Sequence, residues 1–319
     1  MIEGEVSKMR VRTIVAAIAV CLLVAGSAAA EIEIHQKHRF DARPGATVVV
    51  DVSFHSVEVT AQPGNSVDVT VDITVKGSGS SSKNAANDLT PVFEEDGDKL
   101  IIRSTRKKGW SWKSISAKGK VTVQMPPGMN LTIDSSSGGA KITGDFGDGV
   151  VRFDASSGSL TVDGAMGELH SDLSSGSVRA TVSRPVDVFT ADASSGSVKF
   201  AGGARTAKVG TSSGSINVAG LQGACSFSAS SGSIKAQWDA IPPQTKVRAS
   251  ASSGSVTLWF PEDTKVSGTL NVSSGGLHSD FPALVRGKDK LELDGGPGAI
   301  DVEVSTSSGS IKLLTNEGS

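Results

Sequence analysis

The residues best placed for chemistry are four aspartates that recur at one position of an internal repeat. Each lies two residues before a Ser-Ser-Gly motif, and they are Asp134, Asp154, Asp172 and Asp192. Stacked copies of the repeat would place these carboxylates about 4.8 Å apart, where like charges repel. Neighbouring cations, protonation or bound calcium could offset the repulsion. Lys141, Arg179 and Lys199 lie just beyond the same motifs, so surface salt bridging and serine hydrogen bonds are the favoured interpretation over calcium.

Paired acids also line the clefts of polysaccharide-cleaving β-helix enzymes. Those enzymes need bulky aromatic platforms for sugar rings, and Trp238 and Trp259 alone do not supply one. A nucleophilic serine would need a base and an orienting acid nearby. His170 and His278 fall at outward positions of different repeats, and the repeated serines are typical of turns. We therefore expect no catalytic residues.

Two further groups of residues could take part in chemistry, but a structural role is the preferred interpretation for each. The N-terminal cluster His35, His38 and Asp41 loosely resembles a metal site, but a linker over residues 31–45 is preferred. Cys225 falls at an inward position and is expected to be a small apolar filler. The sequence thus indicates neither a metal nor a cofactor.

One stretch combines cations with tryptophans and is the candidate ligand-binding loop. Its contact residues would be Arg106, Lys107, Lys108, Trp110, Trp112 and Lys113. Basic residues beside exposed aromatics bind sugars, anionic glycans or phosphate headgroups. The alternative is a solvated hairpin whose tryptophans cover the end of the core.

A repeated tetrapeptide dominates the elements that must position these residues. Ser-Ser-Gly-Ser or Ser-Ser-Gly-Gly occurs nine times, and the first eight copies are 18 to 22 residues apart. The turn glycines are Gly138, Gly158, Gly176, Gly196, Gly214, Gly232, Gly254, Gly275 and Gly309. A short, steady period of this kind is typical of repeat architectures.

Apolar residues alternate with polar ones on both sides of each motif. Val151, Phe153 and Ala155 precede one copy, and Leu160 and Val162 follow it. This period of two predicts two half-buried strands per repeat, whereas a helix would need apolar spacings of three and four. Identical turns kept in phase favour stacking over a sandwich of hairpins.

The chain is therefore expected to be all-β, a flattened single-chain β-solenoid with rungs of about 19 residues. Parallel pairing between rungs would align equivalent side chains in columns. Glycine at the turn can take a positive φ, and stacked serines can hydrogen-bond along the column.

The expected organisation has five parts. Residues 1–30 resemble a secretory signal peptide cleaved after Ala30, with an uncleaved anchor as the alternative. The rest comprises the linker 31–45, a degenerate β cap over 46–125, the solenoid over 126–315 and a tail 316–319. A flexible loop is expected over 77–82 and an insertion over 281–298. The strand 311–314 would then be an open edge, suited to self-association.

The recurrent Ser-Ser-Gly-Ser followed by an aliphatic residue resembles a large bacterial family of secreted proteins, the putative adhesins of unknown function. The resemblance covers residues 46–315, including Met125–Gly128 before the first motif and Gly295–Gly298 before the last. It implies a β-solenoid and brings no catalytic residues.

We expect an exported, non-enzymatic binding or structural module of the cell envelope, located in the periplasm, on the cell surface or outside the cell. Its partner would be an envelope glycan or protein of unknown identity. The formal net charge of −2 disfavours nucleic acid. The alternatives are an accessory protein of envelope-stress signalling and a carbohydrate-active enzyme.

Overall fold

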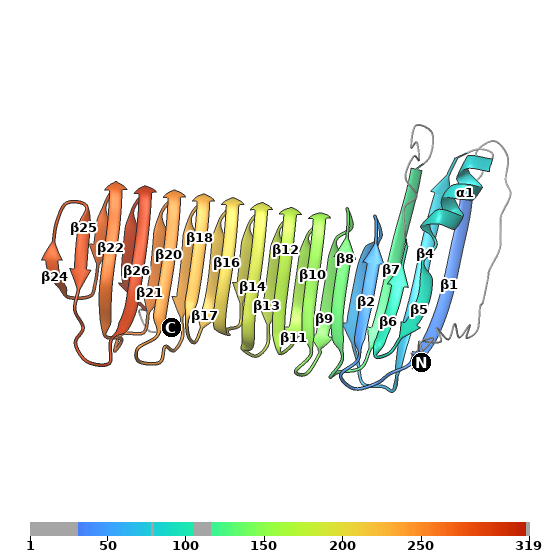
Figure 1. Ribbon diagram of the computed structural model, residues 1–319, viewed down its shortest axis with the longest axis horizontal. Coiled ribbons are helices and arrows are strands. Elements are labelled where there is room, and N and C mark those ends of the chain that lie inside the picture. Colours follow the sequence, from blue (N-terminus) through green and yellow to red (C-terminus); the bar gives the residue numbers. More distant parts are fainter. Residues whose placement is uncertain (1–30, 78–79, 105–115, 317–319) are drawn as a thin grey trace, which may run out of the picture.

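The structure, a computed structural model, describes residues 31–77, 80–104 and 116–316, and these form an elongated stack of β rungs (Figure 1). The 27 strands of this described part join in one hydrogen-bonded network that folds into two facing layers. Each repeat gives one strand to each layer. We call the layer built from strands before the serine–glycine turns sheet A, and the layer built from strands after them sheet B.

Sheet A is parallel except at its two ends. In spatial order its strands are β5 (Val92–Asp96), β6 (Lys99–Arg103), β2 (Thr47–Val52), β8 (Asn130–Ser135), β10 (Val150–Ser157), β12 (Glu168–Ser175), β14 (Val186–Ser195), β16 (Ala204–Ser213), β18 (Cys225–Ser231), β20 (Lys246–Ser253), β26 (Ile300–Ser308), β22 (Val266–Ser274), β25 (Lys290–Leu293) and β24 (Ala283–Arg286).

Sheet B follows the same rungs on the other side of the stack. Its strands are β1 (Glu31–Asp41), β4 (Ser66–Lys76), β7 (Ser116–Met125), β3 (Ser56–Ala61), β9 (Ala140–Asp145), β11 (Leu160–Ala165), β13 (Val178–Val182), β15 (Val198–Ala201), β17 (Ile216–Leu221), β19 (Ile234–Trp238), β21 (Val256–Phe260), β27 (Ile311–Thr315) and β23 (Leu277–Ser279).

The turns stack in register, as the repeat predicts. Ser157 pairs with Ser175, Ser175 with Ser195, and the same pairing continues as far as Ser274 of β22. Inward residues fill the space between the layers: Phe153 is fully buried, and the rings of Phe189 and Phe200 stack with centroids 4.1 Å apart. The solenoid interpretation is therefore confirmed.

Hydrogen bonds between rungs explain why the motif contains glycine followed by serine. The Gly196 N–H donates to the Ser213 carbonyl (2.9 Å), and the Ser197 N–H donates to Ser177 Oγ (3.3 Å). Gly196 has φ of 148°, and a Cβ there would lie 1.7 Å from the Gly176 carbonyl oxygen. The stacked backbones therefore leave no room for a side chain at this position.

The rungs do not all stack in chain order. The last rung, β26 and β27, lies between the rung of β20 and β21 and that of β22 and β23. Figure 1 shows β26 between β20 and β22. Because β27 is paired on both sides, the expected open edge at the C-terminal strand does not exist. The insertion forms β24 and β25, which extend sheet A beyond β22.

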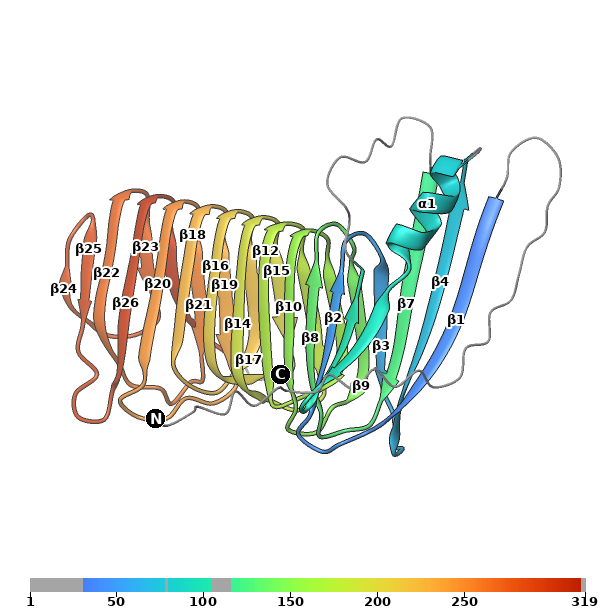
Figure 2. The same ribbon diagram turned by 45° about the vertical axis from the view of Figure 1, so that its right-hand side comes forward.

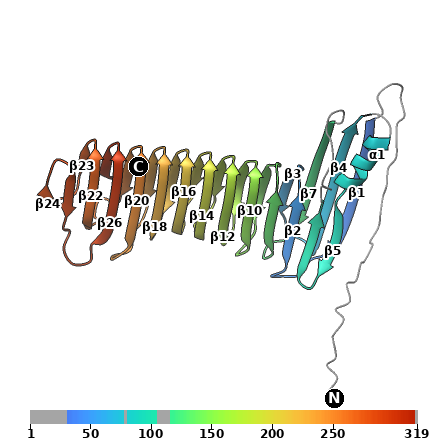
Figure 3. The same cartoon turned by 45° about the horizontal axis from the view of Figure 1, so that its top comes forward.

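The N-terminal end also departs from expectation. Residues 31–41 are not a linker but the long strand β1, paired with β4 over its whole length. Helix α1 (Ser80–Leu89) begins where a flexible loop was expected, and Ala85, Ala86 and Leu89 are buried. Their spacing gives the helix an apolar side that packs against β4 and β1 (Figure 3). No helix in the described ranges is long and apolar enough to span a membrane.

His55 occupies the place of the turn glycine in the rung of β2 and β3. The His55 side chain is fully buried and packs against Gly119. A Cβ at position 119 would lie 2.2 Å from His55 Cδ2, so only glycine fits there. His55 Nδ1 lies 3.4 Å from Ser104 Oγ. Burial lowers the pKa of His55 to about 4, from 6.5 in the unfolded chain.

We expect this buried histidine to make the N-terminal end acid-sensitive. Between pH 6.5 and about 4 the unfolded chain binds a proton that the folded chain does not, so stability falls as the pH falls through this window. The loss attributable to His55 should reach about 2–3 kcal/mol at pH 4.5. Denaturant unfolding of the wild type and His55→Asn at pH 7 and pH 4.5 measures it. An equal pH dependence in both proteins would contradict the assignment.

Candidate binding faces

An acidic column runs along the outside of sheet A. The strand register places Asp134 opposite Asp154, Asp154 opposite Asp172, and Asp172 opposite Asp192, so the four predicted residues do stack. The column also includes Asp51, opposite Asp134, which sequence reasoning missed. Asp51 has the same spacing to its turn, but that turn reads Ser53-Phe54-His55, and the absent glycine concealed the repeat.

The electrostatics of this column follow from its spacing. Burial, and then the charges of Asp154 and Asp51, raise the pKa of Asp134. Burial and the charge of Asp172 raise the pKa of Asp154, partly offset by Arg152 and His170. At the end of the column, Arg103 Nε lies 3.0 Å from Asp51 Oδ2.

The expected salt bridges to this column are not formed. Lys141, Arg179 and Lys199 lie on sheet B, on the opposite side of the turn, and none makes an ion pair with another described residue. The expected pairing with these three cations was wrong because the chain reverses at the glycine, which sends residues before and after it to different faces.

The acidic column lines a shallow, open groove rather than a cleft. Serines of the adjacent turns, including Ser136, Ser156 and Ser174, share its lining. Within the described ranges, no group of three or more acidic, histidine or cysteine side chains is arranged to hold a metal ion. Trp238 is buried, with Nε1 donating to the Gly223 carbonyl (2.9 Å), and Trp259 lies on sheet B. The tryptophans named as sugar platforms are therefore not beside the carboxylates.

A second column, of cations, runs along the outside of sheet B. It consists of Lys141, Arg179, Lys199, Lys235 and Lys312, and we call it the cation column. Thr161, Asn217 and Thr257 occupy the intervening positions of the register. From β9 to β27 the column spans seven rung steps, about 34 Å.

The five cations are exposed and, among the described residues, make no ion pairs. The hydroxyls of Ser177, Ser197 and Ser215 border the column at its turn side. Asp163, on β11, is an exposed acid in the neighbouring column of the same sheet. Glu58, on β3, lies opposite Lys141 at the end of the column and pairs with Lys120 (2.8 Å). From Lys141 to Lys312 the column is therefore a line of positive charge that makes no ion pair with a described residue.

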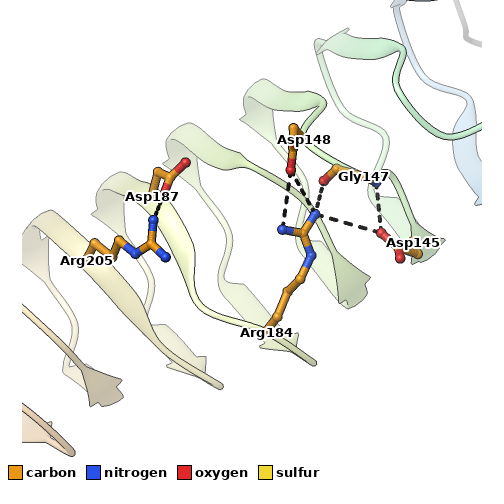
Figure 4. Close-up of polar contacts among 6 residues, drawn as sticks. All are labelled: Asp145, Gly147, Asp148, Arg184, Asp187 and Arg205. Carbon is orange, nitrogen blue, oxygen red and sulfur yellow. Dashed lines mark hydrogen bonds and ion pairs between the residues drawn. The ribbon is translucent and has the colours of Figure 1, made fainter.

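At the edge of the stack away from the serine–glycine turns, two arginines form ion pairs with aspartates (Figure 4). Arg184 contacts Asp148 (3.4 Å) and the Gly147 carbonyl, and Arg205 Nη1 lies 2.7 Å from Asp187 Oδ1. Arg184 belongs to the turn after β13 and reaches back to the turn after β9. Arg184 thus links turns two rungs apart, and Arg205 links the adjacent strands β16 and β14, whereas the cation column makes no ion pair with a described residue.

The remaining predicted residues have structural surroundings or lie outside the described part. Arg106, Lys107, Lys108, Trp110, Trp112 and Lys113 fall outside the described residues. Cys225 is buried, which raises the pKa of its thiol to about 12. His170 hydrogen-bonds Thr190 (2.7 Å) and Glu168 (2.9 Å). His35 and His38 point to opposite sides of β1, so they do not converge on one site.

A known protein family matches most of the chain, including the stacked turns and both columns. Residues 49–314 match the family described as Toastrack DUF4097. The chain belongs to this family. The Toastrack match spans both columns and stops short of the C-terminal tail. No curated protein matches the chain.

Solved structures similar to this Toastrack chain share little sequence with it. A putative adhesin from Parabacteroides distasonis ATCC 8503 is 13% identical, with a TM-score of 0.49, and the alignment covers 87% of this chain and 96% of that one. A putative lipid binding protein from the same strain is 15% identical, with a TM-score of 0.48 and the same coverage. A putative adhesin from Bacteroides fragilis NCTC 9343 is 13% identical, with a TM-score of 0.40, covering 88% and 96%.

Proposed function

We propose that this protein is an exported, non-enzymatic binding module of the cell envelope, and that its cation column holds a linear anionic polymer. The observation that carries the proposal is the exposed column of Lys141, Arg179, Lys199, Lys235 and Lys312 on one sheet, whose members make no ion pair with a described residue. Export rests on the signal-peptide pattern of residues 1–30.

The geometry suits an extended chain better than a compact ligand. Successive cations are one or two rung steps apart, about 5–10 Å, and they lie on one line. A polymer with a phosphate or carboxylate on each unit could contact several of them at once. Multiple weak contacts to one chain add up to useful affinity through effective concentration. The serine hydroxyls beside the column can donate hydrogen bonds to sugar or phosphate oxygens.

Charge reversal within the column should weaken polymer binding. The probes are polygalacturonate, a linear carboxylate polymer, and long-chain polyphosphate. Lys199→Glu should raise Kd for the preferred polymer about tenfold, since it replaces an attraction by a repulsion at the centre of the line. Isothermal titration at two salt concentrations measures Kd, and binding should weaken at the higher salt.

The matched control is Lys208→Glu, which makes the same charge change on the outside of sheet A. It should leave Kd within about twofold of the wild type. Failure to bind either polymer, or an equal effect of both substitutions, would contradict the proposal. Polymer shortened after incubation with the protein would contradict its non-enzymatic part.

The loop that contains Arg106–Lys113 remains a second candidate contact. In the sequence it lies between β6 and β7. Alanine substitution of Lys107, Lys108 and Trp110 in the same titration separates its contribution from that of the cation column.

A further inference from the structure

The four ends of the two sheets are not equally protected. At the C-terminal end, sheet A ends in β24 with four residues and sheet B ends in β23 with three. At the N-terminal end, sheet A ends in β5 with five residues, whereas sheet B ends in β1 with eleven. Figure 2 shows β1 as the long outermost strand beside β4. No described strand pairs with its outer edge. A long, regular edge is a template for another strand.

The backbone groups that β1 presents can be assigned from its pairing with β4. The Ala42 N–H, one residue past the strand, donates to the Asn65 carbonyl (2.9 Å) and continues the β1–β4 register. In an antiparallel ladder, alternate residues direct both backbone groups to the same neighbour. Even-numbered residues therefore face β4, and residues 31, 33, 35, 37 and 39 direct their N–H and C=O groups to the free edge.

The charges on β1 are partly matched within the chain. Glu31 pairs with Lys76 (3.1 Å), His35 with Asp72 (2.6 Å) and Arg39 with Asp68 (2.6 Å), all across to β4. Glu33 and Lys37 stand opposite Thr74 and Thr70 and make no ion pair with a described residue. These two unmatched, opposite charges are equally distant from His35 along the strand.

We propose that two copies of this protein pair through their β1 edges, antiparallel, about a two-fold axis at His35. In this register Glu33 of each copy lies directly opposite Lys37 of the other, so both unmatched charges gain partners. Glu31 of each copy lies opposite Arg39 of the other. The charges alternate in sign along this row, which runs from Lys76 and Glu31 of one copy to Arg39 and Asp68 of the other. The interface is self-complementary, as a two-fold dimer requires.

The inward side of β1 is compatible with the same register. Ile32 and Ile34 are half-buried at the edge, and a second strand would cover them further. Gln36 Oε1 is buried and lacks a hydrogen-bond partner in the described part of the chain. In the proposed dimer Gln36 lies opposite Ile34 of the second copy and diagonal to the second Gln36. A diagonal amide is within reach of a long side chain, so the two Gln36 amides can bond each other.

The two copies would form one continuous sheet, running β7, β4, β1 and then β1, β4 and β7 of the second copy. The acidic and cationic columns lie farther along the stack and stay exposed. The pairing is thus independent of polymer binding at the cation column.

Sedimentation velocity over a concentration series of the purified protein tests the pairing. The wild type should sediment as a dimer at micromolar concentration and above. Glu33→Lys alone or Lys37→Glu alone places like charges opposite each other at two symmetric positions, so each should raise the dimer Kd roughly tenfold. The double variant Glu33→Lys with Lys37→Glu restores opposite charges and should return Kd to near the wild-type value.

A backbone variant tests the edge itself. Proline at position 37 removes an N–H that faces the free edge, and it leaves the β1–β4 hydrogen bonds intact. Lys37→Pro should therefore give a monomer whose melting temperature is close to that of the wild type at monomeric dilution. A wild type that is monomeric at 100 µM, or a dimer that the charge and proline variants leave unchanged, would overturn the proposal.

Discussion

Substituting aspartate for Phe153 is expected to prevent the chain from folding. The Phe153 side chain is fully buried between the sheets, among inward residues of the neighbouring rungs such as Ile133 and Ser171. A carboxylate there would lose its hydration, find no cation, and leave the ring volume unfilled. The loss should exceed about 4 kcal/mol, comparable to the whole stability of many domains. Circular dichroism and a thermal melt of the purified variant measure it.

Two controls separate burial from the chemistry of the substitution. Phe153→Leu keeps an apolar side chain and should cost about 1–2 kcal/mol. Ser226→Asp adds the same carboxylate at an outward position, opposite Arg248 on the next strand, and should change stability by less than about 0.5 kcal/mol. A folded Phe153→Asp with a wild-type melting curve would show that the inward assignment is wrong.

Replacing Gly196 with alanine should also be severely destabilising, although alanine is small and apolar. The residue has φ of 148°, and the new methyl group would lie 1.7 Å from the Gly176 carbonyl oxygen. Relief requires the two rungs to separate at the turn, which breaks hydrogen bonds such as that from Gly196 N–H to Ser213. We expect a loss of about 3–5 kcal/mol in the free energy of unfolding.

Gly64 provides the matched control for this substitution. It lies in the turn between β3 and β4, and a Cβ there would have no atom within 4 Å. Gly64→Ala should change the free energy of unfolding by less than about 1 kcal/mol. Equal denaturant midpoints for the two alanine variants would mean that the turn column does not depend on glycine.

The repeated part of the fold was predictable because one rule generates every rung. Alternation around each motif identifies inward residues such as Phe189 and Val209, both of which are buried. The regular spacing of the turns also predicts which residues of successive rungs lie opposite each other. Asp154 and Asp172 could be placed opposite each other because no assumption beyond in-phase stacking was needed.

The ends were not predictable, since they depend on which rungs pair rather than on local pattern. Nothing in the strand Ile311–Thr315 indicates that it inserts between β21 and β23. The period of the repeat says that rungs stack, but not that the chain must stack them in order. Residues 31–41 alternate only weakly in polarity because β1 is an edge strand, and of its inward residues only Phe40 is buried.

The sequence shows the residues of the cation column as polar positions between apolar ones. It does not show that they share a face from which the stacked aspartates are absent. Lys141 and Lys199 were expected to neutralise aspartates that are near in sequence. The turn separates them onto opposite faces, and only the three-dimensional arrangement shows that neither lysine pairs with an acid in the described part of the chain.

The most direct test of the proposed function is a lysine footprint. The protein is acetylated with and without saturating polyanion, and modification of each lysine is quantified by mass spectrometry. The proposal predicts protection of Lys141, Lys199, Lys235 and Lys312 on sheet B, with Lys208 and Lys246 on sheet A modified at unchanged rates. Equal protection of both faces, or protection confined to sheet A, would contradict it.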